Sequence, residues 1–496
     1  MVVEGYPTIG STSQLQPRSA SAADRRVLLD NQAKEAAQAI KSAVSRNASL
    51  LLISHFDADG LSAGSITLAS VSRLGTSAHL RIVENMTDPV LEEIAKIESD
   101  LVVFSDIGSG YIPSISKILQ DKEIVIADHH QSVGEPPRNI HHFNPHLLGF
   151  DGATEVSGAG TAYILAKALD PANVDLSPLA IVGCLGDQQD KGPKRAMIGL
   201  NAEILKDATS TKLVEATQDL IFYGRQTRPI HKAIATTTSP FLPGLSGEED
   251  KCLALLDSAN IQTKVDDRWR TVSDLSVDEK RRLVDRIVQY MIGLKLSGEV
   301  ALDLVGTVYT LTREDPWTPL KDGREYSSLL NACGRMQRPS LGVALGLGDR
   351  GAVFEEAQAV YQDYRKSLAK YMGWITENPS VLRQLGPLVI VRGEGVIPEG
   401  MTGAVSSLVS SSNLFGDKRV TIVVSNTKDG EFKLSTRGTD YLVSKGLNLG
   451  RTLQSLCEKY GGNGGGHTIA AGATVDPLVL DKFLQELAAA VEAISS

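Results

Sequence analysis

The sequence predicts an α/β protein: a doubly wound, mostly parallel sheet with a helical insertion, a long connecting helix and a smaller C-terminal α/β domain. In the first third of the chain, short apolar runs alternate with segments of helical periodicity, as in a parallel sheet covered by helices. A new apolar run at residues 387–391 opens a second α/β series. With 496 residues, the chain is too long for one ordinary hydrophobic core, so we expect two or three domains.

The composition is typical of a soluble globular protein, with 42% hydrophobic residues. A net charge of −9 and an aromatic content of 5% argue against a broadly basic surface or an aromatic platform for bases, but they leave room for a local basic groove. The four cysteines form no CxxC pair, which is typical of reduced thiols in the cytoplasm. No apolar run reaches the length of a membrane span, so we expect a cytoplasmic protein without a membrane partner.

The N-terminal elements follow one another as the sheet requires. Residues 1–25 indicate a flexible tail, and the apolar spacing of residues 28–45 predicts an entry helix. Strands are predicted at 51–54, 78–84, 101–106 and 123–128, and helices at 61–74, 89–97, 111–119 and 157–169.

Acidic and imidazole side chains follow three of these strands. His55, Asp57 and Asp59 come after the first strand, Asp106 after the third, and residues 128–130 (Asp-His-His) after the fourth. The carboxyl ends of parallel strands meet at one edge of the sheet, where open α/β folds bind ligands. So many charged ligand-type groups would repel one another unless a cation held them. The pattern predicts a metal centre; taken alone, the first motif could also be an Asp-rich turn that caps the following helix.

Asp187 follows a further apolar run at residues 179–185. It is either an additional metal ligand or a solvent-facing carboxylate in a loop, and the local pattern does not separate the two.

The middle of the chain carries no obvious chemistry. A Pro- and Gly-containing junction begins near residue 225, and helices are predicted at 248–259 and 278–296. Ser276 and Glu279 have the spacing of a capping box for the second helix. Residues 353–371 predict a long connecting helix whose aromatic stripe is typical of packing.

The C-terminal unit combines strands with a glycine-rich segment. Strands at 419–425 and 432–437 are predicted to pair around a turn, with helices at 447–460 and 477–494. Residues 461–467 contain five glycines and end in His467, but they lack the Lys-Ser/Thr ending of a Walker loop. They form either an anion-binding loop or a flexible hairpin loop, and the nearby Arg437 favours anion binding.

Taken together, these motifs resemble those of the DHH phosphoesterase superfamily. The ordered set is HxDxDG (55–60), Asp106, Asp-His-His (128–130), Asp187 and GGGH (464–467). Within the superfamily, the chain is similar to RecJ-type exonucleases, particularly the archaeal branch that is associated with GINS. The stretches Asn-Ala-Cys-Gly-Arg (331–335) and Ser-Thr-Arg (435–437), and the insertion at 262–272, support that branch.

The resemblance implies a division into domains. These would be a tail (1–25), a DHH catalytic domain (26–225), a helical insertion (226–300), the completion of the catalytic domain (301–350), a connecting helix (351–380) and a substrate-binding domain with the GGGH loop (385–496).

The resemblance also implies two Mn²⁺ ions, with Mg²⁺ as the alternative. His55, Asp57 and Asp106 would hold one ion, and Asp59, Asp106, His129 and Asp187 the other, with Asp106 bridging. Asp128 would orient the ring of His129, and His130 would face the scissile phosphate. The implied substrate-binding residues are His130, Arg335, Ser435, Arg437, Gly464, Gly465, Gly466 and His467.

The implied activity is that of a single-strand-specific exonuclease acting on DNA, with RNA as an open alternative, in the 5′→3′ direction and in replication or repair. Two other functions stay open: a replisome scaffold associated with GINS and the helicase, and a phosphodiesterase for short oligonucleotides. Nuclease-dead relatives lose metal ligands, whereas this chain has the full set. Bacterial members usually carry an OB-type domain for which no segment is left here, so tight binding would depend on a partner such as GINS.

Overall fold

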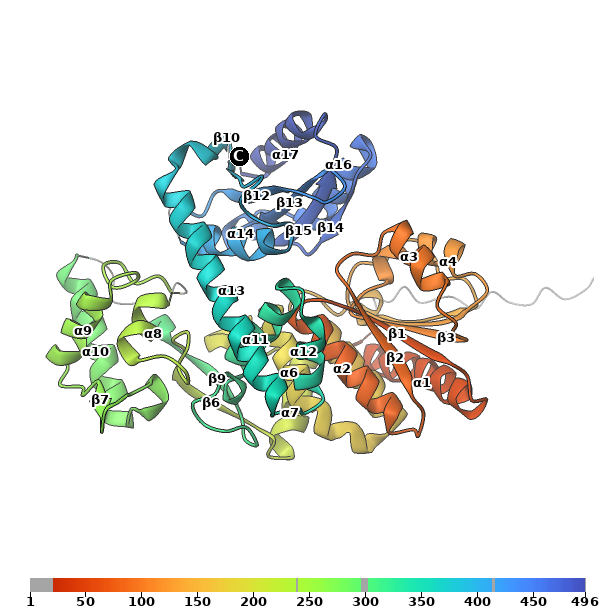
Figure 1. Cartoon of the computed structure of the whole chain (residues 1–496), viewed down its shortest axis with the longest axis horizontal. Helices are drawn as coiled ribbons and strands as arrows, with labels where there is room; N and C mark the ends of the chain where they lie inside the picture. The colour runs from red at the N-terminus through yellow and green to blue at the C-terminus, as the bar shows by residue number, and fades with distance from the viewer. Residues whose placement is uncertain (1–20, 238–239, 296–301, 413–414, 496) are drawn as a thin grey trace, which may run out of the picture.

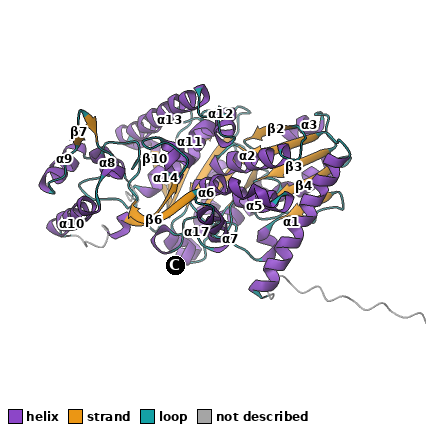
Figure 2. Ribbon diagram, turned by 90° about the horizontal axis from the view of Figure 1, so that it is seen from below, coloured by secondary structure: helices purple, strands orange, loops and turns teal. Residues whose placement is uncertain are grey.

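The computed structural model describes residues 21–237, 240–295, 302–412 and 415–495. Figure 1 shows an N-terminal sheet with its helices (red to yellow), a helical insertion (light green) and a C-terminal domain (blue) reached through one long helix. The insertion and the first helix, α1 (Ala22–Ser45), lie at opposite ends of the molecule in Figures 1 and 2. Within these ranges, no helix has the length and apolar character needed to cross a membrane.

The N-terminal sheet has the strand order β2-β1-β3-β4-β5, and every neighbouring pair is parallel. Its strands are β1 (Leu50–His55), β2 (Ala78–Val83), β3 (Leu101–Ser105), β4 (Glu123–Ala127) and β5 (Ile140–Phe143). α1 and α5 (Gly158–Leu169) cover one face, and α3 (Asp88–Ala95) and α4 (Ile112–Ile118) cover the other. The predicted doubly wound sheet is therefore confirmed.

The strand order reverses at β1, because β2 lies on one side of it and β3 on the other. Open α/β sheets bind ligands at such a switch point, beyond the carboxyl ends of the strands. Strands β1, β3 and β4 all deliver their acidic and imidazole residues to this end.

Two features of this region differ from the prediction. α1 begins at Ala22, where Ser21 and Asp24 form a capping box, so residues 22–25 of the predicted tail are helical. Residues 1–20 lie outside the described part of the chain. Strand β5 was not predicted, because His141 and His142 interrupt its apolar pattern.

A layer of helices packs beside the sheet and shares a core with α2 (Ala58–Ser72) and α5. It comprises α6 (Ser177–Gly186), α7 (Gly199–Ser210), α11 (Gly323–Arg335) and α12 (Pro339–Gly346). Since α11 packs against both α2 and α6, residues more than 250 positions from the first motif lie beside it.

The insertion has a separate core. An antiparallel ribbon of β6 (Val214–Leu220) and β9 (Val305–Leu311) leads the chain into it and back. Its elements are α8 (Ile230–Thr236), α9 (Glu249–Ser258), α10 (Val277–Gly293) and the hairpin of β7 (Lys264–Val265) and β8 (Arg268–Trp269). The capping box of Ser276 and Glu279 begins α10, as predicted.

The connecting helix α13 (Ala352–Glu377) has 26 residues, which corresponds to about 39 Å at 1.5 Å per residue. Its aromatic residues Tyr361, Tyr364 and Tyr371 are buried, so the stripe packs against the core, as predicted.

The C-terminal domain is a six-stranded sheet in the order β10-β11-β12-β13-β15-β14, and only β11 and β12 pair in parallel among its described strands. Its strands are β10 (Leu382–Leu385), β11 (Leu388–Arg392), β12 (Val420–Asn426), β13 (Phe432–Arg437), β14 (Asn463–Gly466) and β15 (Ala470–Val475). Its helices are α14 (Thr402–Ser411), α15 (Asp440–Ser444), α16 (Leu449–Tyr460) and α17 (Leu480–Ser495). α14 covers one face, and α16 and α17 cover the other.

The predicted GGGH loop is wrong in one respect. Its glycines form β14, the edge strand of the sheet, and a turn after His467 leads into β15. Glycine has a low strand propensity, so the sequence pattern did not reveal this strand.

Candidate metal centre and substrate cleft

The first motif is both a helix cap and a cluster of ligand-type groups. Asp57 is the N-cap of α2, and its Oδ1 accepts a hydrogen bond from the Gly60 N–H at 3.0 Å. Its other oxygen, Oδ2, lies 3.0 Å from Nδ1 of His55, the last residue of β1. Burial alone would raise the pKa of Asp57, but the contact with His55 lowers it overall. Helix capping therefore uses one carboxylate oxygen and leaves the other facing the site.

Asp106 stands between two groups of ligand-type atoms. Its Oδ2 lies 3.8 Å from His55 Nδ1, and its Oδ1 lies 3.1 Å from His129 Nε2. The backbone of Asp106 has φ +60°, a region that non-glycine residues rarely adopt and that concentrates at functional sites. A Cβ at Gly158 would lie 2.1 Å from Asp106 Oδ1, so this position has no room for a side chain.

The second group consists of Asp59, His129 and Asp187. His129 Nε2 lies 3.8 Å from Asp59 Oδ2 and 3.7 Å from Asp187 Oδ2. Asp59 also accepts hydrogen bonds from the backbone N–H groups of Gly158 and Ala159, at the N-terminus of α5. Asp187, at the end of α6, has only 18% of its side chain exposed. It belongs to this cluster and is not a solvent-facing loop carboxylate.

The expected role of Asp128 is wrong in its detail. The ring of His129 does not contact Asp128; its Nδ1 faces the carbonyl oxygens of Gly152 and Val156 at 2.7 and 3.1 Å. These acceptors hold the proton on Nδ1, so Nε2 is the nitrogen that faces the carboxylates. Asp128 accepts a hydrogen bond from the His129 backbone N–H, and its Oδ1 lies 2.7 Å from Nδ1 of His130. Asp128 therefore orients the ring of His130, because the strand end turns its carboxylate toward the second histidine of the pair.

The electrostatics of the cluster fit divalent cations. Asp106 Oδ1 and His129 Nε2 are buried and have no hydrogen-bond partner among the described residues. Burial, and then the neighbouring carboxylates, raise the pKa of Asp106 and Asp187 well above the usual range. Burial also raises the pKa of Asp59. Carboxylate oxygens with imidazole nitrogens suit Mn²⁺ and Mg²⁺, which would remove both the repulsion and the orphaned atoms.

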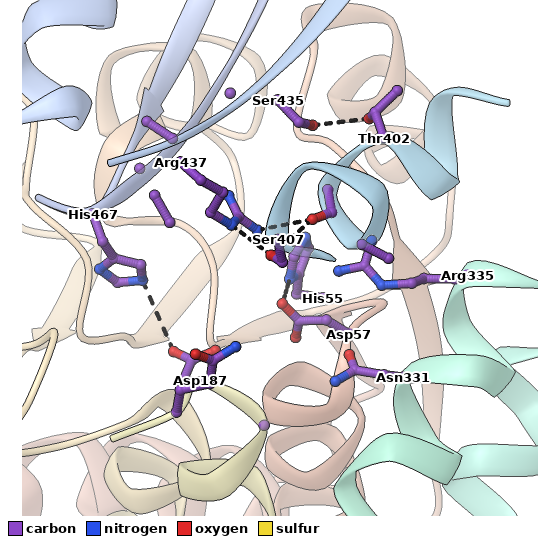
Figure 3. Close-up of a pocket in the computed structure, with 18 of the residues that line it drawn as sticks. His55, Asp57, Asp187, Asn331, Arg335, Thr402, Ser407, Ser435, Arg437 and His467 are labelled. Carbon is purple, nitrogen blue, oxygen red and sulfur yellow. Dashed lines mark hydrogen bonds and ion pairs between the residues drawn. The ribbon is translucent and has the colours of Figure 1, made fainter. Parts of the chain in front are cut away.

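The C-terminal domain faces this cluster across a cleft of about 1810 Å³. His467 extends from it, and its ring stacks on that of His130 at 4.8 Å. Its Nε2 lies 3.9 Å from Asp187 Oδ2, as Figure 3 shows. Burial, and then the nearby His130 and His129, hold the pKa of His467 well below its usual value. The rings of His129 and His130 from one side of the cleft and of His467 from the other side therefore lie next to one another.

Two arginines line the cleft near the start of α14. Arg437 donates hydrogen bonds to the Ser407 hydroxyl at 2.8 Å and the Thr436 carbonyl at 2.9 Å, and Arg335 donates one to the Gly400 carbonyl at 3.0 Å (Figure 3). Neither has a carboxylate partner within the described part of the chain. Burial and the charge of Arg335 lower the pKa of Arg437 to about 10, so the guanidinium group of Arg437 is charged at neutral pH.

The other predicted substrate-binding residues have different surroundings. The Ser435 hydroxyl lies 2.8 Å from that of Thr402, so it lines the cleft while paired within its own domain. Gly464, Gly465 and Gly466 line the cleft as part of β14.

Sequence patterns alone did not reveal several supporting residues. Asn331 Oδ1 accepts a hydrogen bond from the Ala58 N–H at 3.0 Å and so ties α11 to the first motif. A Cβ at Gly334 would lie 1.7 Å from the Phe56 carbonyl oxygen. Both residues belong to the stretch 331–335, which was identified by its resemblance to RecJ-type exonucleases. The sequence did not reveal the contacts that these residues make.

Comparisons with known proteins agree with this architecture. The model of the DHH-CID domain matches residues 222–305, which include the insertion, and the model of the DHHA1 domain matches residues 386–493. The uncharacterized protein MJ0831 of Methanocaldococcus jannaschii is 31% identical over 444 residues, 88% of this chain and 91% of that protein.

RecJ of Thermus thermophilus, a single-stranded-DNA-specific exonuclease, is 25% identical over 255 residues, which are 48% of this chain but only 37% of that protein. Its crystal structure with Mn²⁺ matches with a TM-score of 0.54 and 20% identity, covering 93% of this chain and 55% of RecJ. CDC45 of Entamoeba histolytica matches with a TM-score of 0.60 and 11% identity, covering 93% of this chain and 99% of CDC45. At these identities the structural matches show a shared fold. The chain belongs to the DHH superfamily and is a RecJ-like protein within it.

Proposed function

We propose that this protein is a metal-dependent exonuclease that hydrolyses phosphodiester bonds of single-stranded nucleic acid. The observation that carries the proposal is Asp106, whose two carboxylate oxygens face different groups of ligand-type atoms. This arrangement supports two cations sharing one carboxylate.

In this proposal His55, Asp57 and Asp106 hold one cation, and Asp59, Asp106, His129 and Asp187 hold the other. Bound divalent cations, Mn²⁺ in our proposal, supply a nucleophile at neutral pH and neutralise the phosphate and the leaving oxygen. The protein contributes the fixed positions of these groups: Asp59 is held by the N-terminus of α5, and His129 by two backbone carbonyls.

Arginines from both sides of the cleft would bind the substrate, Arg335 from α11 and Arg437 from β13 of the C-terminal domain. Arg335 and Arg437 carry charges without carboxylate partners among the described residues, and an arginine fork can bind two oxygens of one phosphate. His130, whose ring Asp128 orients, and His467 line the same cleft as these arginines. A phosphate held by the arginines would therefore meet the metal side in one orientation.

The specificity for single strands is also part of the proposal. It is supported by the enclosed position of the cluster between two domains, which suits a strand end better than a duplex, and by the activity named for the Thermus relative. We assign DNA as the substrate, 5′→3′ as the direction, and replication or repair in the cytoplasm as the setting.

A scaffold role in the replisome, in contact with GINS and the helicase, is the second candidate, and the fold shared with CDC45 favours it. The complete set of ligand-type residues favours hydrolysis as well, so the two roles are compatible. Hydrolysis of very short oligonucleotides is the third candidate.

One experiment separates these functions. The metal-free protein is supplied with Mn²⁺ and given 5′- and 3′-labelled DNA and RNA strands from two nucleotides upward. We expect mononucleotides to be released from long single strands and not from duplexes, and only when a divalent cation is present. Turnover of dinucleotides alone would favour the third candidate. No turnover of any strand, with GINS retained in a pull-down, would contradict the nuclease and favour the scaffold.

A further inference from the structure

Three arginines in the described chain are more than nine-tenths buried: Arg225, Arg228 and Arg270. Arg225 pairs with Asp219, and Arg270 holds Glu279 with both arms of its guanidinium group. A buried charge is unfavourable unless a group of opposite charge compensates it. Arg228, at 7% exposure, has no carboxylate within ion-pair distance, and its guanidinium group donates no hydrogen bond to any described residue.

The surroundings of Arg228 hold it in place at the wall of the cleft. Its guanidinium carbon lies 4.5 Å from the centre of the Tyr223 ring. Gly224, at φ +79°, makes room for its stem, since a Cβ there would lie 2.4 Å from Arg228 Cδ. The hydroxyl group of Tyr223 lies 2.8 Å from that of Tyr361, and the ring of Tyr361 faces the guanidinium group of Arg365, so a second arginine lies nearby.

Arg365 extends from α13 and also lines the cleft. Its guanidinium carbon lies 5.8 Å from the centre of the Tyr361 ring, and it too has no carboxylate partner in the described ranges. Like charges kept together without counter-ions form a site for an anion. The cleft thus contains two such pairs, Arg335 with Arg437 and Arg228 with Arg365.

Helix α11 sets the spacing between the two pairs. Near its first turn, Glu325 accepts hydrogen bonds from the Gln226 N–H and the Thr227 hydroxyl, next to Arg228. At its last turn, Arg335 lies beside the metal centre. The ten residues from Glu325 to Arg335 correspond to about 15 Å of helix. A single strand of a few nucleotides spans such a distance.

We propose that Arg228 and Arg365 form a second phosphate-binding site, which holds the backbone of a single strand a few nucleotides away from the metal centre. The proposal rests on the function proposed above, because it takes its ligand from the strand that would be hydrolysed. A purely structural role is the alternative, in which Arg228 only offsets the buried charge of Glu325.

The test compares Arg228→Gln and Arg365→Gln with the unaltered protein, each as the full chain with Mn²⁺. KM is measured for oligothymidylates from two to twelve nucleotides. We expect the ratio of KM for the long strand to KM for the dinucleotide to rise roughly tenfold, since a charged hydrogen bond is lost only by strands that reach the site. The slope of log affinity against log salt concentration should fall by about 0.7 for the long strand, the loss of one phosphate contact.

Arg281→Gln is the matched control, because Arg281 belongs to the same insertion, has 74% of its side chain exposed and does not line the cleft. Arg365 is partly exposed, so its variant keeps the test valid if Arg228→Gln lowers the melting temperature. Equal changes in KM for all lengths, or no change in either variant, would overturn the second site while the nuclease proposal stands. If the unaltered protein neither binds nor hydrolyses any strand, measured by fluorescence anisotropy and product release, both proposals fail.

Discussion

The two sides of the cleft differ in the charged groups that they present. The N-terminal side gathers buried or half-buried carboxylates with imidazoles, and Arg335, at the end of α11, is a cation on the same side. The C-terminal side presents Arg437, which has no carboxylate partner in the described part of the chain. In our proposal, metal ions compensate the carboxylates, and phosphates compensate the arginines. Charged groups without partners, more than the shape of the cleft, thus indicate which ligand each surface would bind.

The largest effect should come from removing the shared carboxylate. Asp106→Asn keeps the shape of the side chain but weakens both proposed cation sites, so we expect Mn²⁺-dependent hydrolysis to fall by about a thousandfold or more. Without metal, the same variant should unfold at a higher temperature, because a buried carboxylate beside Asp59 is gone. Product release and thermal unfolding in EDTA measure the two effects. Near-normal hydrolysis by this variant would show that Asp106 is not a ligand shared by two cations.

The pH dependence of stability sharpens the same comparison. Burial raises the pKa values of Asp59, Asp106 and Asp187. Their protonated forms therefore stabilise the fold at pH values below the ordinary pKa of 3.8, and this stabilisation is lost as the pH rises through the pKa values in the folded protein. His129, with its raised pKa, acts in the same direction, and His467, with its lowered pKa, acts against it. We therefore expect Mn²⁺ to raise the melting temperature more at pH 8 than at pH 5. An equal increase in melting temperature on adding Mn²⁺ at both pH values would contradict the placement of cations among these carboxylates.

Arg437→Lys tests the opposite side. Lysine keeps the charge but loses the fork and its bond to Ser407, so KM for a single strand should rise roughly tenfold. The increase in melting temperature on adding Mn²⁺ should stay the same as in the unaltered protein, since Arg437 holds no cation. Loss of the Mn²⁺ response in this variant would mean that the two sides do not act separately.

The smallest effect should come from Asn331→Ala. The variant removes the hydrogen bond to the Ala58 N–H, and we expect the free energy of unfolding to fall by about 1 kcal/mol. Urea unfolding measures this change, with Asn139→Ala, at a partly exposed turn, as the comparison. An equal loss of unfolding free energy in both variants would show that the hydrogen bond from Ala58 to Asn331 stabilises the protein no more than one at a partly exposed turn.

The sequence predicted those parts of the molecule whose pattern is local. β1, β3 and β4 were predictable because each is a short apolar run ending in an acidic or imidazole residue, and Ser276 marked the start of α10. β6 was missed because four of its seven residues are exposed and polar or small. β14 was missed because glycine carries no strand signal.

The site shows the same limit. The ligand-type residues could be proposed from their spacing, but the acceptors of His129, at Gly152 and Val156, are backbone carbonyls that no side-chain pattern reports. Arg228 could not be singled out either, since only the fold reveals that it is a buried arginine left without an acidic partner.

The chain passes between the two sides of the cleft once, through α13. This single crossing makes the proposed functions separable in part: replacing everything after the helix would exchange Arg437, Ser435 and His467 and leave the proposed cation-binding residues in place. A lineage, or an engineer, could thereby change which polymer is cut without redesigning how it is cut.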